Sequence, residues 1–198
     1  MLKRLLFGVL LLGITIAAQS GSTRQYPIDA NHSTVGFSVP IMNGLSKVTG
    51  KFTDFTVTLN NDEKDITKSS VSVVIKTASI STGIPARDNH LRSADFFDAE
   101  KYPEITFQSN RIVKKGKQLT AVGTFTMHGV SREITIPFSI VGPNKNAAGD
   151  KMNLGYAAHV ALNRRDFGIN WEHKTVPNFV GDTVEVDLDL ITRAINVK

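Results

Sequence analysis

The residue types best suited to chemistry gather in one short stretch, between positions 87 and 95. Arg87, Asp88, His90, Arg92 and Asp95 form the densest polar cluster of the 198-residue chain. The guanidinium of Arg87 or Arg92 suits a polar or anionic headgroup, because its planar fork offers paired donors. If the stretch is helical, Asp88 and Arg92 are four residues apart and can pair. Two interpretations stay open: a headgroup site, or charges that pair among themselves and fix a helix to its surroundings.

His90 with Asp88 or Asp95 also permits an enzymatic hypothesis, in which the pair transfers a proton to or from a lipid-like substrate. A general base needs a partner, a nucleophile or a substrate within hydrogen-bond reach. The sequence shows no nucleophile elbow, paired-acid pocket or metal triad. We therefore predict a protein without catalytic residues and keep the enzyme as an alternative.

Metal, cofactor and nucleic-acid binding are not predicted. The five histidines, at 32, 90, 128, 159 and 173, show none of the usual metal-ligand spacings, and the chain has no cysteine. The formal net charge is +5, but the basic run at 114–117 has no alternating aromatic residues on which bases could stack.

Residues 1–20 have the pattern of a signal peptide. Lys3 and Arg4 precede an apolar run, and Ala18 and Ser20 supply the small residues that a signal peptidase requires. The run is about 14 residues, short of the roughly 20 that span a bilayer, although an uncleaved anchor is the alternative. We expect cleavage near Ser20, a periplasmic location and one mature domain at 21–198. Loss of Lys3 and Arg4 would lower the net charge from +5 to +3.

The elements that must position these side chains are mostly strands, because apolar and polar residues alternate with a period of two. Eight apolar stripes fall at 35–39, 55–59, 71–75, 105–107, 119–127, 134–140, 152–162 and 184–190. Short turn sequences at 114–117, 128–131 and 142–146 separate some of them, which requires antiparallel neighbours. Such long, regularly alternating strands favour an eight-stranded antiparallel β-barrel.

Two segments break the alternation. Residues 84–97 carry Pro85 near their start, followed by apolar residues at three-residue steps, which predicts a helix of about three turns near the barrel mouth. Thr82 is the expected cap of this helix. A shorter helical turn is expected at 41–46.

The interior of the barrel admits two interpretations. Ala121, Gly123 and Ala158 are small, whereas Phe125 and Tyr156 on the same faces are large. Small residues in the middle of long strands leave space for an apolar guest. Alternatively, bulky neighbours or the helix fill that space and the core is solid.

If the barrel is hollow, the candidate ligand-binding residues line its wall or surround its mouth. Trp171, the only tryptophan, closes one end, stacks on a ligand tail or packs in the core. Arg164 with Asp166 is expected to form a salt bridge at the rim. The candidate residues are Phe37, Val39, Phe55, Arg87, His90, Arg92, Phe107, Phe125, Tyr156, Ala158 and Trp171.

Six ordered segments point to a known family. The most specific is HLRSADFFD at 90–98, with Tyr102-Pro103 after it, and the others are HSTVGFSV at 32–39, TGKFTDF at 49–55, GTFTMHGV at 123–130, NRRDFG at 163–168 and VGD at 180–182. Over about 26–190, the chain resembles the YceI-like family of bacterial secreted polyisoprenoid-binding proteins. The resemblance implies a lipocalin-like barrel, often dimeric, that binds a long amphiphile and does not catalyse a reaction. Ligands in the family include isoprenoid quinones, polyprenyl phosphates and fatty-acid-derived amides.

The sequence thus predicts an exported, soluble carrier that holds an isoprenoid, an isoprenoid quinone or a fatty-acid-derived lipid for transport or storage. A homodimer and transient contact with a membrane are compatible with this prediction. Besides the enzyme, the alternative is a structural or stress-response protein without a ligand, which would instead expose a sizeable apolar patch.

Overall fold

The computed structural model describes residues 23–197. The predicted signal peptide at 1–20 lies outside these residues. The strands are β1 (Thr23–Pro27), β2 (Thr34–Ile41), β3 (Ser46–Phe52), β4 (Phe55–Asp62), β5 (Ser70–Lys76), β6 (Ile80–Ser81), β7 (Glu104–Lys115), β8 (Gln118–Met127), β9 (Val130–Lys145), β10 (Lys151–Asn163), β11 (Thr183–Ile191) and β12 (Ile195–Asn196). The α-helix is α1 (Pro85–Arg92), and the short 3-10 turns are η1 (Ala30–His32), η2 (Ile66–Lys68), η3 (Thr77–Ser79) and η4 (Arg164–Phe167).

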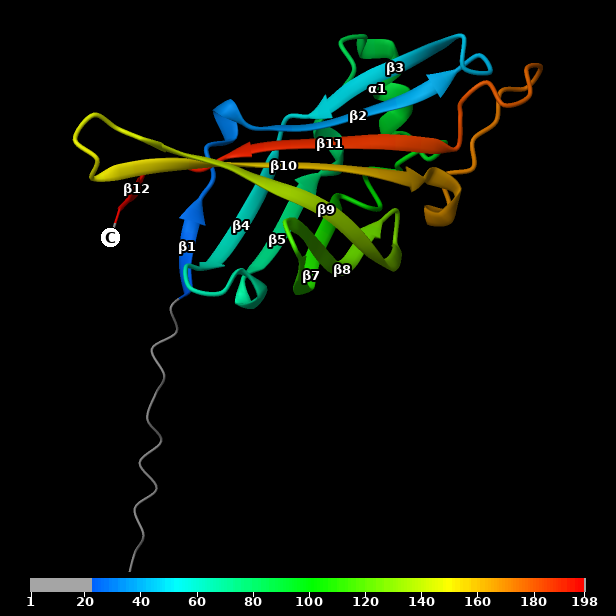
Figure 1. Ribbon diagram of the computed structural model, residues 1–198. Helices are drawn as coiled ribbons and strands as arrows, with labels where there is room; N and C mark the ends of the chain where they lie inside the picture. Colours follow the sequence, from blue (N-terminus) through cyan, green and yellow to red (C-terminus); the bar gives the residue numbers. More distant parts are fainter. Residues whose placement is uncertain (1–22, 198) are drawn as a thin grey trace, which may run out of the picture.

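All the strands join one antiparallel sheet that curls into a half-barrel. Neighbours follow the order β1-β4-β5-β7-β8-β9-β10-β11-β2-β3-β6, and β12 pairs with β10. In Figure 1, β4, β5, β7 and β8 run steeply across the more level β2, β10 and β11, and β9 passes between the two groups. The corner between β3 and β4 is fixed by backbone bonds from Thr53 to Ser79 (3.2 Å) and from Lys76 to Asp54 (3.0 Å).

The predicted lipocalin-like antiparallel architecture is confirmed, with more strands than the eight expected. Each predicted stripe lies in a long strand, and the additions are β1, β3, β6 and β12. The helical turn expected at 41–46 is wrong: the chain turns tightly through Met42 and Asn43, both with positive φ, and continues as β3. The alternation of β3 was too weak to detect because most of its residues are exposed.

The helix is shorter than the predicted 84–97. Pro85 begins α1, as expected of a residue without an N–H to satisfy, but the helix ends at Arg92. Thr82 does not cap it. Instead the Asp88 carboxylate, inside the helix, accepts hydrogen bonds from the Thr82 backbone N–H (2.8 Å) and hydroxyl (2.5 Å). These bonds hold the pKa of Asp88 below its usual value.

The outer face of the sheet offers a test of the β10–β11 register. His159 lies opposite Asp187, and its two ring nitrogens contact the Asp187 carboxylate at 2.7 Å and that of Glu185 at 3.0 Å. The hydrogen bond with Asp187 raises the pKa of His159 above 6.5. Because the folded-state pKa is the higher one, this contribution to stability is complete below about pH 6.5 and lost as the pH rises through the folded pKa. NMR titration should show the raised pKa, and Asp187→Asn should lower it.

Candidate functional site

The curled sheet encloses a cavity of about 230 Å³. Its wall is almost entirely aliphatic and aromatic, and comes from β2 to β5 and β7 to β11, together with Leu91 of α1 and the segment that follows this helix. A void with such a wall stays dry and accepts an apolar guest. Of the two interpretations of the interior, the structure shows the hollow one.

The polar residues of the wall lie near its ends. Asn60 and Asn61, near the end of β4, form part of the wall beside Ser69 and Ser70. Arg164, directly after β10, is the only charged residue in the lining as far as residues 23–197 show. The middle of the wall therefore selects for hydrocarbon, and a polar headgroup can be recognised only near an end.

Six of the sequence-predicted residues line this cavity, and they come from four different strands. Their side chains meet there because the alternation of each strand sends every second residue to the inner face. Phe37 and Val39 lie on β2, Phe107 on β7, Phe125 on β8, and Tyr156 and Ala158 on β10.

The charged candidates of α1 do not reach the cavity. Arg87 binds Thr82, through its hydroxyl (2.7 Å) and its carbonyl (3.1 Å). Arg92 donates to the carbonyls of Ala78 (2.7 Å) and Ile80 (3.0 Å), and so does not form the pair with Asp88 that helical spacing predicted. These contacts match the interpretation in which the polar cluster fixes the helix to the sheet.

Phe55, His90 and Trp171 also stand outside the lining, although each packs close to it. Phe55 packs against the core. The Trp171 ring stacks on Phe96 at 5.1 Å between centroids and meets the edge of His90 at 5.5 Å. Because Phe96 lines the cavity, the tryptophan is one side chain away from it.

Gly123, expected to leave space inside the barrel, has a different role. A Cβ at this position would lie 2.3 Å from the Gln108 carbonyl oxygen and 2.7 Å from Ser109 Cα. The neighbouring strand β7 bulges between Ser109 and Arg111, directly opposite. The glycine therefore allows β7 to approach closely at this bulge, and the space of the cavity is left by Ala121 and Ala158, which do line it.

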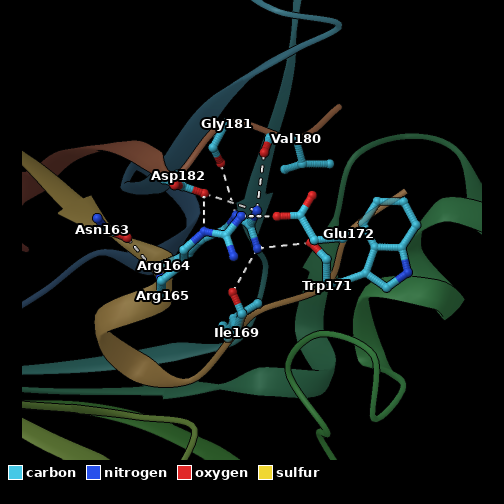
Figure 2. Close-up of polar contacts among 9 residues, drawn as sticks. All are labelled: Asn163, Arg164, Arg165, Ile169, Trp171, Glu172, Val180, Gly181 and Asp182. Carbon is cyan, nitrogen blue, oxygen red and sulfur yellow. Dashed lines mark hydrogen bonds and ion pairs between the residues drawn. The ribbon is translucent and has the colours of Figure 1, made fainter. Parts of the chain in front are cut away.

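Arg164 uses all its donors within the protein. Its Nε donates to Gly181 (3.0 Å), its Nη1 to Ile169 (2.7 Å) and Trp171 (3.2 Å), and its Nη2 to the Val180 carbonyl (3.2 Å) and the Asp182 carboxylate (3.1 Å). Figure 2 shows the guanidinium surrounded by these oxygens. A guanidinium has five N–H groups, so none remains for a ligand.

The consequence of this network is a closed end. The side chain of Arg164 is only 4% exposed, and it ties both ends of the 169–181 segment to the end of β10. Arg165 adds outer ties, to Asp182 at 2.6 Å and to Glu172. The rim salt bridge predicted between Arg164 and Asp166 is wrong, because the partner is Asp182.

The pair considered for catalysis is present but exposed. His90 Nε2 lies 2.8 Å from the Asp95 carboxylate, and about half of each side chain is open to solvent. Within the described part of the chain, no three His, Asp or Glu side chains are grouped so as to hold a metal ion. Over the same residues, no helix is long and apolar enough to cross a membrane.

Comparison with known proteins gives a consistent result. The model of the family described as YceI-like domain matches residues 26–192. Protein YceI of Escherichia coli O157:H7 is 34% identical over 170 residues, which are 85% of this chain and 88% of that protein. The crystal structure of Burkholderia cenocepacia BcnA superposes with a TM-score of 0.74 at 22% identity, covering 84% of this chain and 99% of that one. A polyisoprenoid binding domain from Saccharophagus degradans gives a TM-score of 0.58 at 17% identity, covering 86% and 98%.

Proposed function

The chain belongs to the YceI-like domain family, and from this membership we propose that it binds one long apolar lipid of the isoprenoid type inside its half-barrel. The observation that supports the proposal most directly is the cavity, whose wall is hydrocarbon over its whole middle part. The fold is shared with a protein described as a polyisoprenoid binding domain.

The energetics favour a tail over a compact ligand. Burial of apolar area contributes roughly 25 cal/mol per Å², before the costs of association are subtracted. A long flexible tail thus gains affinity from length alone, without specific contacts. Along β10 the lining runs from Tyr156 to Leu162, six residue steps or about 20 Å of strand. Half of a bilayer's hydrocarbon core is only about 15 Å thick, so the site suits a tail longer than that of an ordinary membrane lipid.

Transport or storage of this lipid in the periplasm is part of the same proposal. It is supported by the signal-like sequence of residues 1–20 and by the small residues at Ala18 and Ser20. Enclosure in an apolar cavity would let a lipid with a long tail cross an aqueous compartment, because the tail is kept out of water throughout.

Mass spectrometry of the native protein tests the binding. The protein should be purified from its own host without detergent and extracted with organic solvent. We expect one class of prenyl or similarly long lipid, in about equimolar amount. A protein that emerges free of lipid and does not bind an added prenyl lipid would contradict the proposal.

A further inference from the structure

A second, more polar pocket adjoins the cavity at the end away from Arg164. The two share Asn61, Ile66 and Tyr156 in their walls. The pocket lies where the β4–β5 connection, with η2, meets the β7–β8 turn and the first residues of β10. In Figure 1, η2 and the β7–β8 turn lie on one side of the sheet, and η4, which contains Arg164, lies at the far end of β10.

Tyr156 stands at the junction with a hydroxyl that is unused within the described chain. Its neighbours in the β10 ladder are Ile140 and Leu190, both apolar. Burial raises the pKa of Tyr156 to about 12, so the hydroxyl is protonated at neutral pH and available as a donor. A hydroxyl group at the end of an apolar tunnel is well placed to donate a hydrogen bond to an oxygen atom of a bound molecule.

The charges around the pocket favour an anion. Lys64, Lys114 and Lys117 contribute three positive charges, and none of these side chains forms an ion pair with another described residue. The two carboxylates in the wall are engaged elsewhere: Asp62 accepts from the Lys64 and Asp65 backbone N–H groups (both 2.9 Å), and Glu63 binds Arg24 and Tyr26. The lysines thus leave the pocket with net positive charge.

The opposite end offers no comparable partner. The five donors of Arg164 are all used by the 169–181 segment and Asp182. The neighbouring charged side chains are paired with one another as well, because Arg165 binds both Asp182 and Glu172. A headgroup placed there would lose its hydration without gaining hydrogen bonds, which is costly for a charged group. The two ends of the cavity are therefore chemically different.

We infer that the bound lipid has a fixed orientation, with an anionic, phosphate-type headgroup in the pocket of Tyr156, Lys114 and Lys117 and the end of its tail beneath Arg164 and Phe96. The inference rests on the proposed function, because it assigns a direction and a headgroup class to the same ligand. The Tyr156 hydroxyl donates to a headgroup oxygen, and the lysines supply charge at the solvent edge.

Headgroup preference is tested with two lipids that share one tail, geranylgeranyl monophosphate and geranylgeraniol. The phosphate should bind roughly tenfold more tightly at low salt, and the advantage should largely vanish at about 1 M salt, where charges are screened within about 3 Å. Lys114→Gln with Lys117→Gln should remove the advantage, whereas Lys47→Gln, on exposed β3, should keep it. Tyr156→Phe should weaken phosphate binding about tenfold while the fold is unaffected. Equal binding of the two lipids by the unaltered protein would overturn the headgroup assignment.

Orientation is tested with Trp171, the only tryptophan, which lies one side chain from the tail end of the cavity. A prenyl phosphate brominated at the end of its tail should quench tryptophan fluorescence strongly, and one brominated beside the headgroup should not. Stronger quenching by the head-labelled lipid would overturn the inferred orientation while leaving lipid binding intact. Absence of binding by both lipids would instead contradict the proposed function itself, so the two failures are distinguishable.

Discussion

Replacing Ala158 with phenylalanine should abolish lipid binding and leave the fold intact. Ala158 lies in the middle of β10, between Phe138 of β9 and Leu188 of β11, and its side chain lines the cavity. A benzyl group there would project into the space that the tail needs. Because that space is empty, the cost to the fold should stay at or below the roughly 1–3 kcal/mol typical of an overpacked core.

The measurement is the affinity for a prenyl lipid, which we expect to fall at least about a hundredfold. Ala157→Phe is a matched control: the same substitution one residue away, opposite Ser139 and Asp189 and outside the cavity lining. Its side chain points to the other face of the sheet, so binding should be retained. Undiminished affinity in Ala158→Phe would mean that the lipid does not occupy the cavity.

The second large effect is expected at Arg164. Its replacement by alanine removes every hydrogen bond between this guanidinium and the 169–181 segment, and leaves four backbone carbonyls without this donor in a largely buried place. A buried acceptor left without its donor costs about 1–3 kcal/mol, so with four carbonyls affected and some relaxation around them we expect a total of about 3 kcal/mol or more. The free energy of unfolding, measured with denaturant, should fall by that amount.

Two further variants separate the hydrogen bonds from the charge. Arg164→Lys keeps the charge but has three donors instead of five, so its stability should lie between those of the alanine variant and the unaltered protein. Arg111→Ala removes an exposed pair with Glu133 (3.7 Å) and should cost less than about 1 kcal/mol. A loss in Arg164→Ala no larger than that in Arg111→Ala would show that the network does not hold this end closed.

The long strands were predictable because one rule, alternation, governs each of them locally. Residues 119–127 and 152–162 show it clearly, and both became continuous strands. The short strand β3 was missed since its outward residues are polar and only Phe52 is fully buried. The helix was predicted too long because apolar residues at three-residue steps continue to Phe97, whereas the backbone turns away after Arg92 through Ser93.

The residues that line the middle of the cavity could be predicted from the sequence, whereas the contacts at its ends could not. Phe37, Phe125 and Ala158 were found from strand periodicity, which also decides which residues face inward. Spacing along the chain reveals only local partners, and so it pairs Arg164 with the nearby Asp166. Its actual partner, Asp182, lies directly before the next long strand, β11, and four of the contacts of Arg164 are backbone carbonyls, which no sequence pattern marks.

An open half-barrel has two free margins at which another polypeptide could extend the sheet by main-chain hydrogen bonds. Here the outermost strands are short: β1 has five residues, and β6 has two, which cover only Lys51 and Phe52 of β3 and leave residues 46–50 of β3, mostly polar and exposed, at that border. Arg92 in addition occupies the Ile80 carbonyl on β6. Short edge strands, with some of their backbone hydrogen-bonding groups already used, offer little template for a strand of another polypeptide. This protects an incompletely closed sheet against edge-to-edge aggregation.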